Sequence, residues 1–242
     1  MSTVSNRARV RTFGKYLRQT RREACTIRFG GFLLSNRQTH NNMSQKFLSA
    51  VAARRSFYGI GSGSPISKNK ITDIVHQAVK HTPSSFNSQS ARVVVLFGKQ
   101  HHRVWDITKE MLKPMTNAEQ FPNTVKKLDS FRAGHGTILF FEDMQVVRSF
   151  QEKYARFQDP FGQWSQQSNG MLQFVVWTAL EAEGLGASLQ HYNPIIDNKF
   201  KDEFKIPDHW SLLAEMPFGE RLSQPGEKQF APVEDRVKVF DD

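Results

Sequence analysis

Three short apolar runs, separated by stretches of helical periodicity, restrict this chain to a fold of helices packed on a sheet. Residues 93–97 and 137–141 are almost entirely apolar or β-branched, and residues 211–216 form a third run that ends before Pro217. Runs of this length between loop signals are typical of buried strands. Because the strands alternate with helices, we expect a layered α/β or α+β domain.

Helical periodicity is strongest in two segments, which match the i, i+3, i+4, i+7, i+8 template of an amphipathic helix in full. The second segment is apolar on its other sides as well, so we expect it to lie centrally or at a subunit interface, with Gly184 as its C-terminal cap. Weaker patterns predict helices over 47–52, 104–112 and 125–131, and an edge strand within 227–242. The template residues are Ile71, Ile74, Val75, Ala78 and Val79, followed by Leu172, Val175, Val176, Ala179 and Leu180.

The positive charge is concentrated in the first 42 residues. The chain has 33 Lys and Arg against 23 Asp and Glu, and residues 1–42 hold nine of the basic residues but only one acidic residue, Glu23. The remaining 24 basic and 22 acidic residues nearly cancel. A nearly neutral body is unlike a protein that grips phosphate backbones, so we expect no nucleic-acid partner.

The segment 1–42 is rich in Arg, Ser and Thr, which is typical of a mitochondrial transit peptide. The alternatives are a disordered basic tail or an upstream extension that is absent from the working protein. Met43 is a natural start, so we divide the chain into this extension and one domain over 43–242. We expect the mitochondrial matrix if the extension acts in targeting, and the cytoplasm or nucleus if it is dispensable.

The rest of the composition excludes several classes of site. The single cysteine, Cys25, lies in the extension, so the domain has no disulfide and no thiol nucleophile. No apolar run approaches the roughly 20 residues of a membrane span, and we expect no membrane partner. The adjacent His101 and His102 lack metal-ligand spacing, and we expect no metal site. Gly184-Leu185-Gly186 resembles the opening of a dinucleotide fingerprint, but it follows a helix and has leucine where the third glycine belongs.

Two polar motifs are candidates for ligand binding. Arg54-Arg55-Ser56 places two guanidinium groups and a hydroxyl at a predicted helix end, where they could bind a phosphate or merely stabilise the helix terminus. Residues 83–90, Pro-Ser-Ser-Phe-Asn-Ser-Gln-Ser, offer many hydroxyl and amide groups. These groups could recognise a polar heterocycle, or they could belong to an ordinary turn.

Taken together, the motifs resemble the nitroreductase superfamily, in its fungal fatty-acid-repression and bacterial copper-induced branch. The resemblance extends from about residue 47 to about residue 240 and depends on separated motifs in the same order. Besides Arg54-Arg55-Ser56 and residues 82–89, these motifs are residues 96–107 (LFGKQHHRVWDI), 136–143 (GTILFFED), 184–194 (GLGASLQHYNP) and 216–219 (MPFG).

The resemblance implies a three-layer α+β fold with a central, mainly antiparallel sheet flanked by helices, assembled as an intertwined homodimer. It implies one FMN per subunit at the dimer interface, NADH or NADPH as electron donor, and a small nitroaromatic or quinone acceptor reduced by a ping-pong mechanism. The flavin carries the chemistry, so no catalytic side chain is expected. The implied FMN-binding residues are Arg54, Arg55, Ser56 and Lys228 near the phosphate, Ser84, Ser85, Asn87 and Gln89 from the partner chain, and backbone groups of His191 and Tyr192 near the flavin N5.

This sequence departs from the family pattern at three places. Lys228 is a single charge where many members have a basic pair, and Arg221 or Arg236 are candidates to compensate. Tyr58 replaces a lysine that faces the flavin in several relatives. Glu215 stands where close relatives tend to have glutamine. Aromatic residues at Phe121 and in 154–164 could form the wall of an acceptor site or part of the core.

The alternative function is that of a flavin-binding regulatory or stress protein with little turnover.

Overall fold

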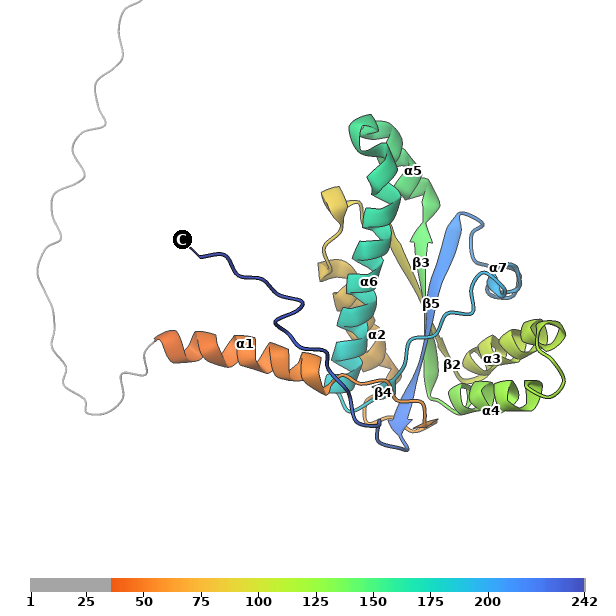
Figure 1. The fold of residues 1–242 in the computed structure, drawn as a ribbon. Helices are drawn as coiled ribbons and strands as arrows, with labels where there is room; N and C mark the ends of the chain where they lie inside the picture. Colours follow the sequence, from red (N-terminus) through yellow and green to blue (C-terminus); the bar gives the residue numbers. More distant parts are fainter. Residues whose placement is uncertain (1–35, 242) are drawn as a thin grey trace, which may run out of the picture. The chain divides into compact units, whose positions relative to one another are not determined.

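The computed structural model describes the backbone of residues 36–241 and the side chains of residues 42–241. Residues 42–242 form one compact unit, and the extension up to residue 35 lies outside the described residues. Three 3-10 turns join the regular elements: η1 (Ser85–Asn87), η2 (Lys113–Met115) and η3 (Ala155–Phe157). The helices are α1 (Asn36–Ala53), α2 (Lys68–His81), α3 (Gly98–Leu112), α4 (Phe121–Arg132), α5 (Met144–Lys153), α6 (Gln158–Ala182) and α7 (Asp197–Phe204), and the strands are β1 (Ile60–Gly61), β2 (Ala91–Phe97), β3 (Gly136–Asp143), β4 (Gly186–Ala187) and β5 (Trp210–Arg221) (Figure 1).

The described strands form one antiparallel sheet with the order β1-β5-β3-β2, and β4 pairs with β5. β3 is flanked on both sides, and all eight of its residues are buried. The predicted strands at 93–97 and 137–141 are confirmed as parts of β2 and β3. Only β3 has the full burial that a continuous apolar run predicts. β2 is an edge strand of the described sheet, and most of its residues are half-buried.

The third predicted strand is longer than expected, because β5 continues through Pro217 to Arg221. Pro217 lies opposite Thr137 of β3 and is buried. A proline removes one donor from the ladder but keeps its carbonyl, and here that carbonyl accepts a hydrogen bond from the N–H of Ser188 at 3.3 Å. The prediction that Pro217 ends the strand is therefore wrong.

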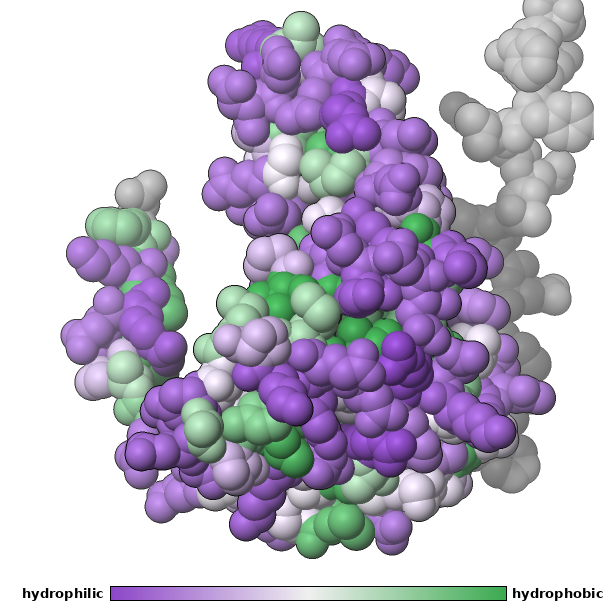
Figure 2. Space-filling model, turned by 90° about the vertical axis from the view of Figure 1, so that its right-hand side faces the viewer, coloured by the Kyte–Doolittle hydropathy of each residue, from purple (hydrophilic) through white to green (hydrophobic). Residues whose placement is uncertain are grey.

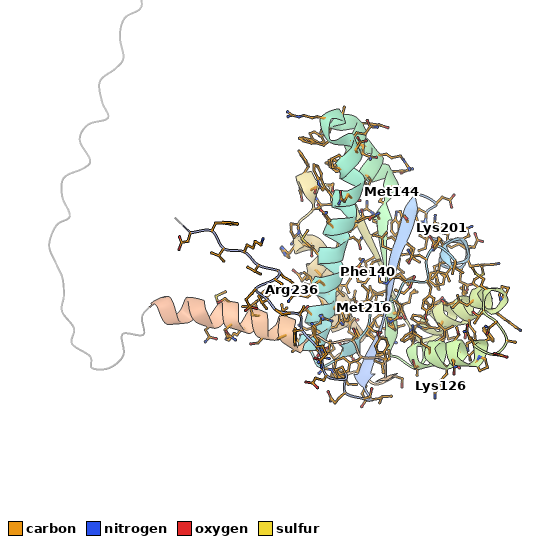
Figure 3. All side chains as sticks on the ribbon, viewed as in Figure 1. Lys126, Phe140, Met144, Lys201, Met216 and Arg236 are labelled. Atoms are coloured by element: carbon orange, nitrogen blue, oxygen red, sulfur yellow. The ribbon has the colours of Figure 1, made fainter. Side chains whose placement is uncertain are left out.

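Helices cover both faces of the sheet, which confirms the three-layer α+β prediction. On one face, α2 and α6 pack on the sheet through an apolar cluster that includes Phe140 and Met216 (Figure 3). On the other face, α3, α4 and α7 cover a second cluster around Trp105 and Phe131. Viewed from this second side, the surface of the molecule is largely hydrophilic and shows only scattered apolar patches (Figure 2).

The two helices with the strongest periodicity are confirmed, and Gly184 follows the end of α6 with a φ of +88°, as expected of a cap residue. α6 begins at Gln158, which is 14 residues before Leu172, the first template residue of the predicted segment. The apolar periodicity is lost there because the buried stripe continues with Ser165, Ser168 and Asn169.

Sequence patterning failed at three other places. α5 and α7 were missed: they are short, with 10 and 8 residues, and each buries a single side chain, Val147 or Phe200. The predicted edge strand within 227–242 is wrong for the described part of that tail, which contains no strand. Val237 and Val239 alternate with polar residues in the sequence, but both are exposed. Because neither side chain packs on a buried face, burial does not stabilise a strand here.

Candidate functional site

A cavity of about 430 Å³ lies between the end of α1 and the segment that follows β5. Residues 54–58 form one side and residues 223–228 the other. The first side is fixed to the sheet, because Ser56 bridges to Ala187 of β4 and the N–H of Phe57 donates to the Ala187 carbonyl at 2.9 Å. The second side follows directly from the last residues of β5. The antiparallel ladder thus brings together two segments about 170 residues apart.

The two arginines of this cavity have different environments. The Arg54 guanidinium lies 4.2 Å from the centre of the Trp177 ring, and partial burial lowers the pKa of Arg54, against the opposing effect of Glu181. The Arg55 guanidinium donates to the carbonyl of Gly226 and so joins the two sides of the cavity. Lys228 adds a third cation, exposed and close to the Phe230 ring. All four residues predicted near a phosphate therefore line one cavity.

This arrangement suits an anion with several oxygen atoms. Guanidinium groups donate in pairs to phosphate oxygens, and a lysine adds a mobile positive charge. The residues that line the cavity include one acidic residue, Glu227, and three basic residues, Arg54, Arg55 and Lys228. The cavity therefore has an excess of positive charge. The Ser56 hydroxyl adds an uncharged hydrogen-bond donor.

Neither arginine proposed to compensate for the single lysine lines this cavity. The Arg221 guanidinium is fixed by Glu181, whose carboxylate lies 3.0 Å away, and it also donates to the carbonyls of Glu181 and Leu185. Burial raises the pKa of Glu181, and the charges of Arg221 and Arg54 lower it. Arg221 thus joins the end of α6 to β5, while Arg236 lies farther along the exposed tail (Figure 3).

The second predicted segment lies away from the cavity within one chain. Ser84 and Gln89 line a separate depression of about 210 Å³ next to Ser168 and Leu172 of α6. Ser85 is half-buried, and Asn87 is exposed. A single chain therefore does not bring these residues to Arg54 and Lys228.

The backbone of this segment is unusual. Phe86, Asn87 and Gln89 have φ values of 54°, 54° and 49° in the left-handed region, although none is glycine. Such conformations cost about 1–3 kcal/mol each and persist where the surroundings impose them. Ser84 stabilises the turn, because its hydroxyl accepts from the Gln89 N–H at 2.9 Å and its carbonyl from the Asn87 N–H at 2.9 Å.

The third predicted segment, His191-Tyr192, connects β4 to α7. Two backbone hydrogen bonds between Gln190 and Glu215, of 2.7 and 2.9 Å, attach its start to β5. The Tyr192 N–H donates to the Glu215 Oε2 at 3.0 Å, and the Tyr192 carbonyl accepts from Ile195. Both backbone groups of Tyr192 are thus occupied, whereas those of His191 have no partner among the described residues.

Glu215 is an acid enclosed in the core. Its exposed fraction is 0%, and no described group forms a hydrogen bond with its Oε1. Burial raises the pKa of Glu215 to about 8, with a smaller contribution from Asp197, while the Tyr192 N–H opposes the shift. Burial and the nearby Glu215 raise the pKa of the Tyr192 phenol to about 12.

Sequence reasoning missed Lys127, which lies close to the Phe131 and Tyr192 rings. Its ammonium is 5.8 Å from the centre of the Phe131 ring and 6.0 Å from that of Tyr192, and the Tyr58 ring is 6.4 Å from Phe131. Lys127 is exposed on α4 and looks in the sequence like any solvated helix residue. Only the tertiary structure brings this cation to the Phe131 and Tyr192 rings.

The aromatic residues of 154–164 pack on one another and on Phe86. The Phe86 ring lies 4.7 Å from Tyr154 and 5.7 Å from Phe161, which is itself buried. Phe121, on α4, has none of the ring contacts of this cluster. Within the described residues there is no group of three or more acidic, histidine or cysteine side chains that could hold a metal, and no helix long and apolar enough to cross a membrane.

The fold and the cavity define an α+β protein with an antiparallel sheet between two helical layers and a cationic site at a sheet edge. A family model described as "Nitroreductase family" matches residues 51–220. The chain belongs to the nitroreductase family, a family of oxidoreductases.

Individual relatives agree with this assignment. The chain is 34% identical to HBN1 of Saccharomyces cerevisiae over 80% of its length and 96% of that protein, and 30% identical to nitroreductase FRM2 of the same organism over 76% and 92%. Nitroreductase CinD from Lactococcus lactis, solved in complex with chloramphenicol, is 38% identical with a TM-score of 0.74, over 81% of this chain and all of CinD. CinD was also solved with 4-nitrophenol. A protein of the same fold from Desulfovibrio desulfuricans, 20% identical with a TM-score of 0.57, was solved in complex with FMN.

Proposed function

We propose that this protein is an FMN-dependent oxidoreductase that takes electrons from NADH or NADPH and reduces a small nitroaromatic or quinone acceptor. The observation that carries the proposal is the convergence of Arg54, Arg55, Ser56 and Lys228 on one cavity. These groups match the chemistry of a ribityl phosphate, and their mutual approach is not explained by any ion pair among the described residues. The nitroaromatic ligands of CinD support the acceptor class.

In this scheme, the protein's own groups would bind and orient FMN. Arg54, Arg55 and Lys228 would neutralise the phosphate, and the unpartnered backbone of His191 would face the flavin edge. When bound, FMN supplies the hydride and electron chemistry. Donor and acceptor would occupy the same opening in turn, which is the basis of a ping-pong scheme.

A homodimer is part of the proposal, because Ser84, Ser85, Asn87 and Gln89 do not reach the cavity of their own chain. The apolar surface between α1 and α6 supports it. Phe47, Met171 and Val175 are 61%, 43% and 39% exposed and line a groove of about 390 Å³. An apolar groove of this kind is typical of a surface that another protein chain covers.

The test is the absorption spectrum of the purified protein with and without NADH. We expect a flavin spectrum that NADH bleaches and that a nitro compound or quinone restores. A protein without affinity for FMN would contradict the proposal. A flavoprotein that NADH and NADPH fail to bleach would instead favour a flavin-binding regulatory role with little turnover.

A further inference from the structure

The segment His191-Tyr192 is attached to the sheet through Glu215, by its backbone and by its buried carboxyl group. The Glu215 backbone makes both hydrogen bonds to Gln190, and its side chain receives the Tyr192 N–H at 3.0 Å. No other described side chain forms a hydrogen bond with the backbone of residues 191 and 192. The direction of this connection therefore depends on Glu215.

The surroundings of Glu215 do not neutralise it. The face of the sheet on which Glu215 lies is covered by apolar residues of α3, α4 and α7, including Trp105, Phe131 and Phe200. No ion pair of Glu215 exists among the described residues, and its second oxygen has no partner. An isolated buried carboxylate is costly, so such a group takes up a proton and ionises only at higher pH.

Other charged groups near this face have partners or lie at its edge. Asp197 at the start of α7 disfavours the ionised form of Glu215, and Lys201 acts on Asp197. On α3, His101 is buried and hydrogen-bonded to Thr137 and to the Arg132 carbonyl, and burial lowers the pKa of His101 to about 4. At the edge of this face, Arg132 pairs with Asp106, the Lys127 ammonium lies over the Tyr192 ring, and His191 is exposed.

We propose that Glu215 is a positioning residue that holds the Tyr192 N–H against the sheet, leaves the His191 backbone free for the flavin edge, and carries a titratable charge beside it. This role depends on the proposed function. In the neutral state the carboxyl orients the segment without adding charge. Once ionised, it places a negative charge near the flavin and opposes the accumulation of negative charge on reduction.

The experiment compares the wild-type chain with Glu215→Gln, which keeps an oxygen acceptor for Tyr192 but cannot ionise. Glu220→Gln, an exposed position on the same strand, is the matched control. Two measurements are made on each protein. The first is the infrared band of a protonated carboxylic acid in the FMN-free chain as a function of pH. The second is the reduction potential of bound FMN over the same pH range.

We expect one component of the wild-type infrared band to disappear around pH 8 and that component to be missing from Glu215→Gln. Over the same range, the wild-type potential should fall more steeply with pH than that of Glu215→Gln, while Glu220→Gln follows the wild type. FMN affinity should stay within about twofold in Glu215→Gln, because the hydrogen bond to Tyr192 is kept. It should fall by about tenfold or more in Glu215→Leu, which loses that bond.

Two results would overturn the role of Glu215. One is a chain that binds FMN but shows the same pH dependence of the potential in wild type and Glu215→Gln. The other is the lack of an infrared difference between these two proteins. A chain that takes up no FMN at all would reject the proposed function, and with it this role, even if the infrared band identifies Glu215 as a buried acid. Should Glu215→Leu fail to fold, the comparison with Glu215→Gln still decides the question.

Discussion

At the scale of single residues, the phosphate assignment depends on three cations, Arg54, Arg55 and Lys228, that line one cavity and form no ion pair among the described residues. We expect Arg54→Ala and Lys228→Ala each to weaken FMN binding by about 10- to 150-fold, since each removes a charge-assisted hydrogen bond of about 1.5–3 kcal/mol. The measurement is the dissociation constant from flavin fluorescence. Arg236→Ala is the control, because Arg236 is exposed and does not line the cavity. Full flavin occupancy in both cavity variants would contradict the assignment.

The buried Glu215 carboxyl group also makes the free energy of unfolding depend on pH. Its pKa is raised to about 8 in the folded chain from an ordinary value of 4.5, so the folded state binds more protons than the unfolded state between these pH values. The contribution of Glu215 is therefore fully present below about pH 4.5 and is lost as pH rises toward 8. Relative to Glu215→Gln, the wild-type free energy of unfolding should fall by up to about 1.4 kcal/mol per pH unit in this window.

The check is urea unfolding of both proteins at several pH values. His101 has the opposite effect, because its lowered pKa of about 4 makes the folded chain lose stability as pH falls below 6.5. Both proteins keep His101, so that contribution cancels in the difference. Parallel pH profiles for wild type and Glu215→Gln would show that Glu215 does not stay protonated in the fold.

At the scale of elements, the outer face of α6 is where a second chain is expected. We predict that Met171→Lys and Val175→Asp each produce a monomer, because a charge in this apolar groove would have to be desolvated on association. Sedimentation of the folded proteins gives the mass. Met115→Lys is the control, since Met115 is 66% exposed on η2 and lies outside the groove. If both groove variants remain dimers of normal stability, the interface lies elsewhere.

The same scale shows what the sequence could predict. The buried strands and the α2 and α6 helices were readable, because a face that packs on a core imposes a period on its residues. α5 and α7 have only 10 and 8 residues, which is too short for the five-position template of an amphipathic helix to stand out. The strand through Pro217 could not be foreseen, because its place in the ladder depends on neighbouring strands. The bond between Glu215 and Tyr192 likewise joins residues 23 positions apart, and no local pattern contains it.

The motifs and the family resemblance predicted the residues of the site. The structure then showed which of these residues lie together. Arg54, Arg55, Ser56 and Lys228 share one cavity, whereas Ser84 and Gln89 line another. Lys127 escaped notice, because a lysine on the polar face of a helix has no distinguishing sequence signal. These placements depend on contacts between distant segments, which local patterns do not encode.

At the scale of the whole molecule, a site shared between two chains predicts complementation. Arg54→Ala would impair the cavity of its own chain, and Asn87→Ala would impair the cavity of the partner. Each variant homodimer then has a defect in both sites, but a mixed dimer collects both defects in one site and leaves the other intact. After the two variants are unfolded and refolded together in equal amounts, we expect the mixed dimers to bind FMN at one of their two sites. Since random reassociation gives mixed dimers for about half of the population, roughly a quarter of all sites should recover.

The readout is bound FMN per chain, with mixed dimers verified by differently tagged subunits. The matched control refolds each variant alone and should give no recovery. Verified mixed dimers that bind no more FMN than their parents would count against a shared site. A monomeric mass for the flavin-loaded wild type would reject the idea outright.

The left-handed turn at Phe86, Asn87 and Gln89 has a kinetic consequence. The energetic cost of its strained backbone is incurred when the chain folds, not when a ligand binds. Ser84 holds the turn through two hydrogen bonds. A loop shaped in advance needs no ordering step when a ligand arrives. Encounter with the cofactor should therefore follow a single exponential phase whose rate rises linearly with cofactor concentration. Replacing Asn87 with glycine would relax the strain and loosen the turn, and a slower, concentration-independent phase should then appear.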